Sequence, residues 1–475
     1  MEAARRRVVI IGGGFSGTLV AVNLARAARD PLDVALVTAE AIPGQGVAYG
    51  TRRPEHLLNV VARNMSAFPD LPDHFVRWLR TRGDFDQVPD AELRERFVPR
   101  RVYGDYLRSL LTQYLEPPGR PAHLSFELVE GTAVDIEPAG RKAVVRLADG
   151  RGLPADRIVL ATGNEPPADL PGSADLDGHP AWVGNAWERW HEHLPPAGST
   201  IILLGTGLTT VDAIITLTRL GWEGQVHAVS RHGWLPQPHF RSFDYADFPP
   251  ATPSPETLGL AGLAASFEEH CCRLRDRGLN PALLVDRLRP HTQQIWQRFS
   301  VAEKRAFARE HAARWNVHRH RIAPEIHAQV MAAVRSGRLT VHAATIERLE
   351  RDGDRIRVAL SRGDSLAGDL VVNATGPQLR FSKSGSPLLC RLRDRGLVVT
   401  DEVDMGIRVE QDHSVVPVAG HLLGLLFALG PLLRGTLWET TAVPELRGQA
   451  RRVADAVLGT TYEPVVEPFI TEYTI

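Results

Sequence analysis

The residues with the clearest chemical meaning form a glycine-rich turn near the N-terminus. Residues 12–17 read GGGFSG, a G-x-G-x-x-G pattern between a β-branched run at 7–11 and a helical pattern at 18–29. A short apolar run at 33–37 completes a strand–turn–helix–strand unit. Glycine lets such a turn reverse tightly and lets a pyrophosphate approach the helix N-terminus. We therefore expect a dinucleotide bound by Gly12, Gly14, Phe15, Ser16 and Gly17, the alternative being a structural glycine turn.

The acidic residue that usually binds the ribose at the end of the second strand is displaced in this unit. Thr38 occupies the usual position, and Glu40 follows two residues later. Glu40 remains within reach of ribose hydroxyls, so we expect it to bind the ribose. An ordinary loop glutamate is the alternative.

A second unit of the same kind begins near residue 200. A strand pattern at 200–204 is followed by the letters GTG at 205–207, a helical pattern at 208–220 and another strand pattern at 225–229. The third glycine position holds Thr210, so the pattern is incomplete. Its repetition within one chain still predicts a second dinucleotide site. The expected contacts are Gly205, Gly207, Thr209, Ser230 and Arg231.

Arg231 bears on which nicotinamide cofactor the second unit would take. It follows directly on the second strand of that unit. A 2′-phosphate favours an arginine at this place, whereas the ribose of NAD favours an acid. The sequence therefore predicts NADPH rather than NADH, with a surface arginine on a loop as the alternative.

Two Ala-Thr-Gly turns, ending apolar runs at 158–163 and 370–376, suggest that one domain is inserted in another. Such turns return a strand past a bound dinucleotide or join two domains, and we expect Thr162 and Gly163 to contact the cofactor. The expected fold is α/β, with two three-layer Rossmann-like domains and a helical insertion. The ranges are 1–165 and 371–475 for the first domain, 166–242 and 338–370 for the second, and 243–337 for the insertion.

The expected insertion has its own composition. It opens with a proline-rich piece and continues with helical patterns and a basic cluster at 314–321. This cluster is either an anion contact or a solvated or helix-pairing face. His318 and His320 lack partners at metal-ligand spacing, so we expect no metal. The insertion is the natural lid or specificity element.

Composition limits the classes of function. The chain has 475 residues, a formal charge of 55 minus 56, or −1, and ordinary apolar content. We therefore expect neither a nucleic-acid nor a membrane partner. Three cysteines without a C-x-x-C pair fit a cytoplasmic protein and disfavour a disulfide reductase.

Further motifs along the chain carry a family resemblance. They are the letters GVAYG at 46–50, HLLNV at 56–60, MSAF at 65–68, PRRVYGDY at 99–106 and GPLLRGTLWE at 430–439. With the two glycine turns, they make the chain resemble flavoproteins with two dinucleotide-binding domains, near the N-hydroxylating flavin monooxygenases. The resemblance implies FAD in the first unit and NADPH in the second.

The resemblance also implies contacts to the flavin. It places Leu58-Asn59 and Met65-Ser66 along the flavin ring, and a helix containing Tyr103 beside the FAD. It further implies that Gly430-Pro431 begins the last helix near the isoalloxazine. A strand pattern at 425–429 and Pro431 at the first helical position agree, because such an end presents N–H groups and a positive dipole. Asn59 could instead cap a turn, and Tyr103 could belong to the core.

Three functions remain open at this point. The leading one is an NADPH-dependent FAD monooxygenase that passes oxygen from a C4a-hydroperoxyflavin to an amine nitrogen of a small molecule. The flavin carries that chemistry, so no catalytic side chain is expected. The others are a flavoprotein reductase or oxidase without oxygen insertion, and a non-catalytic flavin-binding regulatory protein.

Overall fold

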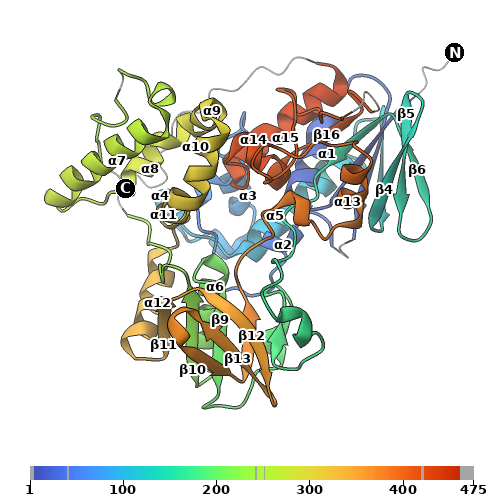
Figure 1. The fold of residues 1–475 in the computed structure, drawn as a ribbon. Helices are drawn as coiled ribbons and strands as arrows, with labels where there is room; N and C mark the ends of the chain where they lie inside the picture. Colours follow the sequence, from blue (N-terminus) through green and yellow to red (C-terminus); the bar gives the residue numbers. More distant parts are fainter. Residues whose placement is uncertain (1–4, 40–41, 241–242, 251, 419–421, 461–475) are drawn as a thin grey trace.

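The computed structural model describes residues 5–39, 42–240, 243–250, 252–418 and 422–460. Two five-stranded sheets organise the chain, one in the upper right of Figure 1 and one at the bottom, with a helical region at the upper left. Within the described ranges, no helix is long and apolar enough to cross a membrane.

The first sheet is parallel and has the order β16-β7-β1-β2-β3. Alternation along its central strand separates two layers, since Val8 and Ile10 join one core and Val9 and Ile11 another. One face is covered by helices and the other by a small antiparallel sheet with a helix. The elements are β1 (Arg6–Ile11), β2 (Leu32–Thr38), β3 (Leu124–Glu130), β7 (Arg157–Leu160) and β16 (Leu426–Ala428), with α1 (Phe15–Ala27), α5 (Arg100–Leu115) and α15 (Val443–Leu458) on one face, and β4 (Ala133–Ala139), β5 (Lys142–Leu147), β6 (Gly152–Ala155) and α13 (Pro387–Asp394) on the other.

The second sheet repeats this plan with the order β11-β10-β9-β15-β8. Ile201 and Leu203 face a helical layer, and Ile202 and Leu204 face a second antiparallel sheet. The expected α/β fold with two three-layer Rossmann-like domains is therefore confirmed. The elements are β8 (Trp182–Val183), β9 (Thr200–Leu204), β10 (Gln225–Ser230), β11 (Leu339–Ala343) and β15 (Leu370–Asn373), with α6 (Leu208–Arg219) and α12 (Pro324–Arg335), and β12 (Ile346–Asp352), β13 (Arg355–Leu360) and β14 (Ser365–Gly368).

The strand β15 bears on where the chain leaves the second sheet. It pairs with β9 and β8, both in the second sheet. The boundary expected between 370 and 371 would cut this strand. We propose that the crossing back to the first domain lies after Asn373.

The helical insertion has a core of its own, which includes Phe248, Leu274, Trp296 and Phe299. The helix α12 falls inside the range expected for the insertion. It packs instead on α6 and β11, because its apolar face joins the core of the second domain. We therefore propose that the insertion ends before α12. Its helices are α7 (Gly259–Asp276), α8 (Leu283–Leu288), α9 (Thr292–Arg298), α10 (Val301–Ala306), a π-helical turn (Phe307–His311) and α11 (Ala312–Arg319).

The segment after β16 differs from expectation. Gly430 and Pro431 begin a short 3-10 turn (Gly430–Leu433) followed by α14 (Arg434–Leu437), and the last helix begins only at Val443. Trp438 has a φ of 63°, which ends α14. The remaining short helices are α2 (Gly46–Tyr49), α3 (His74–Arg80) and α4 (Asp90–Arg94).

Gly435 of α14 provides a test of this packing. An added Cβ would lie 2.0 Å from Cγ of the buried Asp401, whose carboxylate accepts the amides of Val403 and Met405. We expect Gly435→Ala to lower the free energy of unfolding by about 1–3 kcal/mol, measured by denaturant titration.

Gly448 in α15 is the matched control, because an added Cβ would meet no atom within 4 Å. Gly448→Ala should raise stability by about 0.5–1 kcal/mol. Equal stability of Gly435→Ala and the parent protein would contradict the close contact between α14 and Asp401.

Candidate functional site

A cleft of about 390 Å³ lies between the two domains. We call it the interdomain cleft. The first domain contributes α2 and the loop after it, and the second contributes one side of α6 together with the segment 186–192. Its lining residues include Gly46, Gly50, Thr51, Arg53, His56, Trp187, Trp190, Thr209, Asp212 and Thr216.

The first glycine turn leaves no room for side chains at two of its positions. Gly12 has a φ of 115°, and an added Cβ would lie 2.2 Å from the carbonyl oxygen of Ala161. A Cβ on Gly17 would lie 1.9 Å from the carbonyl oxygen of Gly12. Gly14 precedes α1 in an extended conformation, and no side chain caps the helix. This uncapped helix start has the form that the predicted anion site requires.

The α2 segment lies over this turn. Gly44 donates its amide to the carbonyl oxygen of Gly13 at 2.7 Å. A Cβ on Gly14 would be 3.4 Å from Cα of Gly46, which also lines the interdomain cleft. The first turn and the cleft are thus separated by a single backbone segment.

Three buried polar atoms beside the first turn have no hydrogen-bond partner within the described part of the chain: Tyr103 Oη, Thr162 Oγ1 and Gln449 Nε2. The Tyr103 ring stacks on Phe15 at 6.3 Å. Burial raises the pKa of Tyr103 well above its usual value, so its hydroxyl is a donor. Buried polar groups nearly always have partners. A ligand rich in acceptor oxygens, such as a dinucleotide, fits these donors.

The turn at Gly430 reaches the same place, because a Cβ on Gly430 would lie 3.5 Å from Oγ of Ser16. Its amide, however, donates to Oε1 of Gln449 at 2.8 Å, and Pro431 has no N–H. The expected flavin contact at this end therefore cannot use the Gly430 amide, and a contact through the rest of the turn stays a prediction. The structure brings Ser16 and Gly430 together but uses the Gly430 amide internally.

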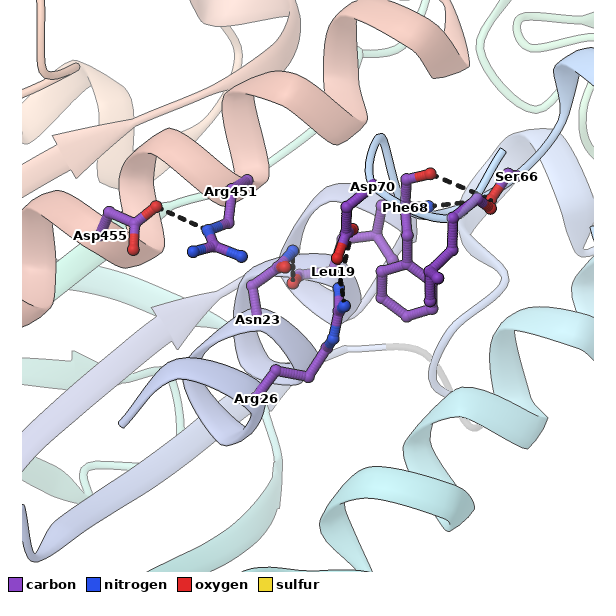
Figure 2. A network of polar contacts seen from close by, with 9 residues as sticks. Leu19, Asn23, Arg26, Ser66, Phe68, Asp70, Arg451 and Asp455 are labelled. Atoms are coloured by element: carbon purple, nitrogen blue, oxygen red, sulfur yellow. Dashed lines mark hydrogen bonds and ion pairs between the residues drawn. The ribbon is translucent and has the colours of Figure 1, made fainter. Parts of the chain in front are cut away.

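Ser66 and Met65 have structural roles. The Ser66 hydroxyl donates to the Leu71 carbonyl oxygen at 2.7 Å, lies 3.1 Å from the Phe68 carbonyl oxygen and accepts the Phe68 amide, as Figure 2 shows in part. Met65 is buried in the first core. The Ser66 hydroxyl is therefore used to form a turn, and the expected position of Met65-Ser66 along the flavin ring stays a prediction.

The loop containing this turn is fixed to α1. Arg26 of α1 binds both carboxylate oxygens of Asp70, as Figure 2 shows. The Asn23 bond to the Leu19 carbonyl oxygen in the same view lies within α1. Arg447 of α15 donates to the carbonyl oxygen of Ser66 at 2.9 Å. These bonds hold the wall of the first domain in place.

Contacts across the interdomain cleft involve residues that the sequence did not single out as site residues. Arg100 at the start of α5 binds Asp212 of α6 at 2.6 and 3.1 Å. His56 bridges Thr51 and Thr216 at 2.9 Å each. Burial lowers the pKa of His56, so a neutral ring with one donor and one acceptor nitrogen lies between the two hydroxyls.

Asn59 also lies at this boundary, since its carbonyl oxygen is 2.8 Å from Nε2 of His239 in the segment after β10. Asp212 could have been noticed as the single acid in a mostly apolar helix. Nothing local in the sequence pairs it with Arg100.

The second glycine turn is built like the first. Gly205 has a φ of 126°, and an added Cβ would lie 2.3 Å from the carbonyl oxygen of Ala374, in the second Ala-Thr-Gly turn. A Cβ added at Gly207 would meet no atom within 4 Å. Thr210 stands in the third glycine position, and its hydroxyl donates to the Gly205 carbonyl oxygen at 2.8 Å. The departure from the glycine pattern is therefore accommodated by a hydrogen bond.

The remaining expected cofactor residues are placed as follows. Thr209 lines the interdomain cleft, and Arg231 is exposed after β10. Gly163 has a φ of 72° in the turn after β7. Glu40 lies outside the described residues, so its ribose contact stays a prediction.

The basic cluster of the insertion is largely paired. Arg321 binds Asp286 at 2.7 and 2.9 Å, and Arg314 binds Glu268 at 2.9 Å. Among the possible roles, the structure favours a helix-pairing face. The described residues contain no group of three or more potential ligands that could hold a metal.

Comparisons with known proteins agree with this geometry. Residues 9–165 match a family model described as FAD-NAD(P)-binding. No curated protein sequence matches the chain. Residues 9–165 are thus the part of the chain that matches a family model, and they contain the first glycine turn.

Solved structures extend the likeness to the whole fold. An ornithine N-hydroxylase from Kutzneria sp. 744 is 18% identical, with 95% of this chain and 99% of that chain covered and a TM-score of 0.65. The ornithine hydroxylase of Pseudomonas aeruginosa is 16% identical, with 96% and 99% covered and a TM-score of 0.63. The L-lysine 6-monooxygenase of Pseudomonas syringae is 20% identical, with 95% and 98% covered and a TM-score of 0.61. The expected resemblance is confirmed: the chain has the fold of N-hydroxylating flavin monooxygenases.

Gly17 tests the first turn. Because a Cβ at this position would meet the Gly12 carbonyl oxygen at 1.9 Å, Gly17→Ala must open the turn. We expect purified Gly17→Ala protein to retain less than about a tenth of the parent flavin, measured as flavin absorbance per protein.

Gly385→Ala is the matched control, since its Cβ would meet nothing within 4 Å and the residue is exposed. It should retain flavin fully. Full flavin content in Gly17→Ala would exclude a flavin site at this turn.

Proposed function

We propose that this chain is an FAD- and NADPH-dependent monooxygenase that hydroxylates an amine nitrogen of a small molecule. The observation that carries the proposal is the repeated glycine turn. Each turn packs its first glycine against the carbonyl of an Ala-Thr-Gly turn, at Ala161 and at Ala374. Two such turns on either side of one cleft fit a pair of dinucleotides that exchange a hydride.

FAD fits the first turn. The amides at the start of α1 would bind its pyrophosphate, and Tyr103, Thr162 and Gln449 would supply the donors that lack partners. NADPH fits the second turn, with Gly207 facing open space and Arg231 exposed for the 2′-phosphate. When bound, FAD accepts the hydride of NADPH and reacts with dioxygen.

The chain's own contribution is orientation and exclusion of water. Arg100 and Asp212 fix α6 against α5, and His56 fixes α6 against the loop after α2. With both helices fixed, the distance between the two dinucleotide sites is set before a substrate arrives. No acid–base side chain is required for this role.

The insertion would supply the substrate pocket. It contains an apolar cavity of about 250 Å³ whose wall includes Phe307 and Trp315. The Trp315 indole lies 3.1 Å from Oε1 of Glu439, and the Trp296 indole donates to the carbonyl oxygen of Gly435 at 2.8 Å. The insertion is therefore fixed to the segment that follows the Gly430 turn.

The test of this function is product formation. Purified protein loaded with FAD is mixed with NADPH, dioxygen and, separately, L-ornithine, L-lysine and cadaverine, the amines named for solved structures of this fold. We expect at least one amine to give a hydroxylamine in proportion to the NADPH consumed. NADPH consumption that yields only hydrogen peroxide with every amine indicates an oxidase without oxygen insertion, and no consumption indicates a non-catalytic protein.

Arg231 tests the choice of cofactor. Arg231→Ala should raise KM for NADPH at least about ten-fold and leave KM for NADH nearly unchanged, because only NADPH carries a 2′-phosphate. Arg219→Ala removes the same charge from an exposed position at the end of α6 and serves as the control. Equal effects of Arg231→Ala on both cofactors would remove the phosphate role.

A further inference from the structure

A chain of hydrogen bonds ties the second glycine turn to the loop after β10. The Thr206 hydroxyl donates its single proton to the Trp234 carbonyl oxygen at 2.6 Å and lies 2.8 Å from the Ser230 hydroxyl. Ser230 must then donate to Thr206, and it accepts the amide of Gly233 at 3.1 Å. Three bonds in series make the turn and the loop one unit, because each hydroxyl both donates and accepts.

The same loop packs against the end of β11 and is hydrogen-bonded to the residue after it. Gly233 has a φ of 62°, and a Cβ there would lie 3.1 Å from the Ala343 side chain. Ala344 donates its amide to the Ser230 carbonyl oxygen at 2.9 Å. The loop is therefore held on two sides, by the glycine turn and by a neighbouring strand.

This rigid loop presents two aromatic rings to solvent. The rings of His232 and Trp234 are stacked, with centroids 4.4 Å apart and planes 16° apart. Both residues are exposed, and Trp234 keeps 42% of its surface accessible. Two rings alone offer too little area for a stable protein interface but enough for one planar heterocycle.

The place of the stack indicates which heterocycle. In a dinucleotide-binding βαβ unit, the end of the second strand meets the adenosine half of the ligand, and its residues read the ribose. Arg231 occupies that end, and His232 and Trp234 follow it directly. A flat aromatic surface just beyond the ribose position fits the adenine ring.

We propose that the His232–Trp234 stack is the adenine platform of the NADPH site, beside Arg231 on the 2′-phosphate. This inference rests on the proposed NADPH site and extends it to two residues that recognise the base. The rings are held in place before binding, so little conformational freedom is lost when adenine stacks on them. Arg231 then selects the phosphate, while the platform binds adenine in NADPH and NADH alike.

Binding of nucleotide fragments tests the platform. Dissociation constants of 2′,5′-ADP and of adenosine 5′-diphosphate are measured by calorimetry on the FAD-loaded protein. Trp234→Ala should weaken both ligands about equally, by at least about ten-fold. Trp234→Phe keeps a flat ring and should stay within about three-fold of the parent protein. Arg231→Ala should weaken 2′,5′-ADP alone.

Leu220→Ala is the control, since Leu220 is an equally exposed apolar residue of the same domain, at 45% accessibility. It should leave both constants unchanged. Parent affinity in Trp234→Ala, an equal loss in Trp234→Phe, or failure of the parent protein to bind either nucleotide would overturn the platform. These ligands carry no hydride, so a protein that hydroxylates no amine would still give the predicted ratios if the platform is correct.

Discussion

Close backbone contact at two glycines is the constraint on which the rest of the structure depends. Gly12 lies against the carbonyl of Ala161, and Gly205 lies against the carbonyl of Ala374, with no room for a Cβ at either place. Each contact brings the start of a helix beside the end of a neighbouring parallel strand. That geometry places the N-terminus of a helix, the kind of end that can bind an anion, at the carboxyl edge of each sheet.

Polar contacts across the interdomain cleft join the two domains. Arg100 and Asp212 are both mostly buried, with side-chain exposures of 12% and 14%. Their two-point geometry fixes direction as well as distance. His56 adds a second contact to the same helix, at Thr216. Both contacts end on α6, so this helix is fixed against the first domain at two points.

Much of the fold could be predicted because its signals are local. The turns at 12–17 and 205–207 stand between clear strand and helix patterns, and the structure keeps both. Long-range partners could not be predicted, since Arg100 and Asp212 are 112 positions apart and share no pattern. The family resemblance implies a flavin contact for Ser66, which stays a prediction, and it gave no sign that a local turn uses the Ser66 hydroxyl. The structure places Gly430 beside Ser16 and bonds its amide to Gln449 on another helix, while the expected nearness of Gly430 to the isoalloxazine stays a prediction.

The central claim is that the two glycine turns hold FAD and NADPH close enough for hydride transfer. Anaerobic stopped-flow mixing of the FAD-loaded protein with NADPH tests it most directly. The account predicts complete loss of oxidised-flavin absorbance in a single turnover, slowed when the transferred hydrogen of NADPH is replaced by deuterium. Flavin that remains oxidised in protein that has retained its FAD and binds NADPH would contradict the account.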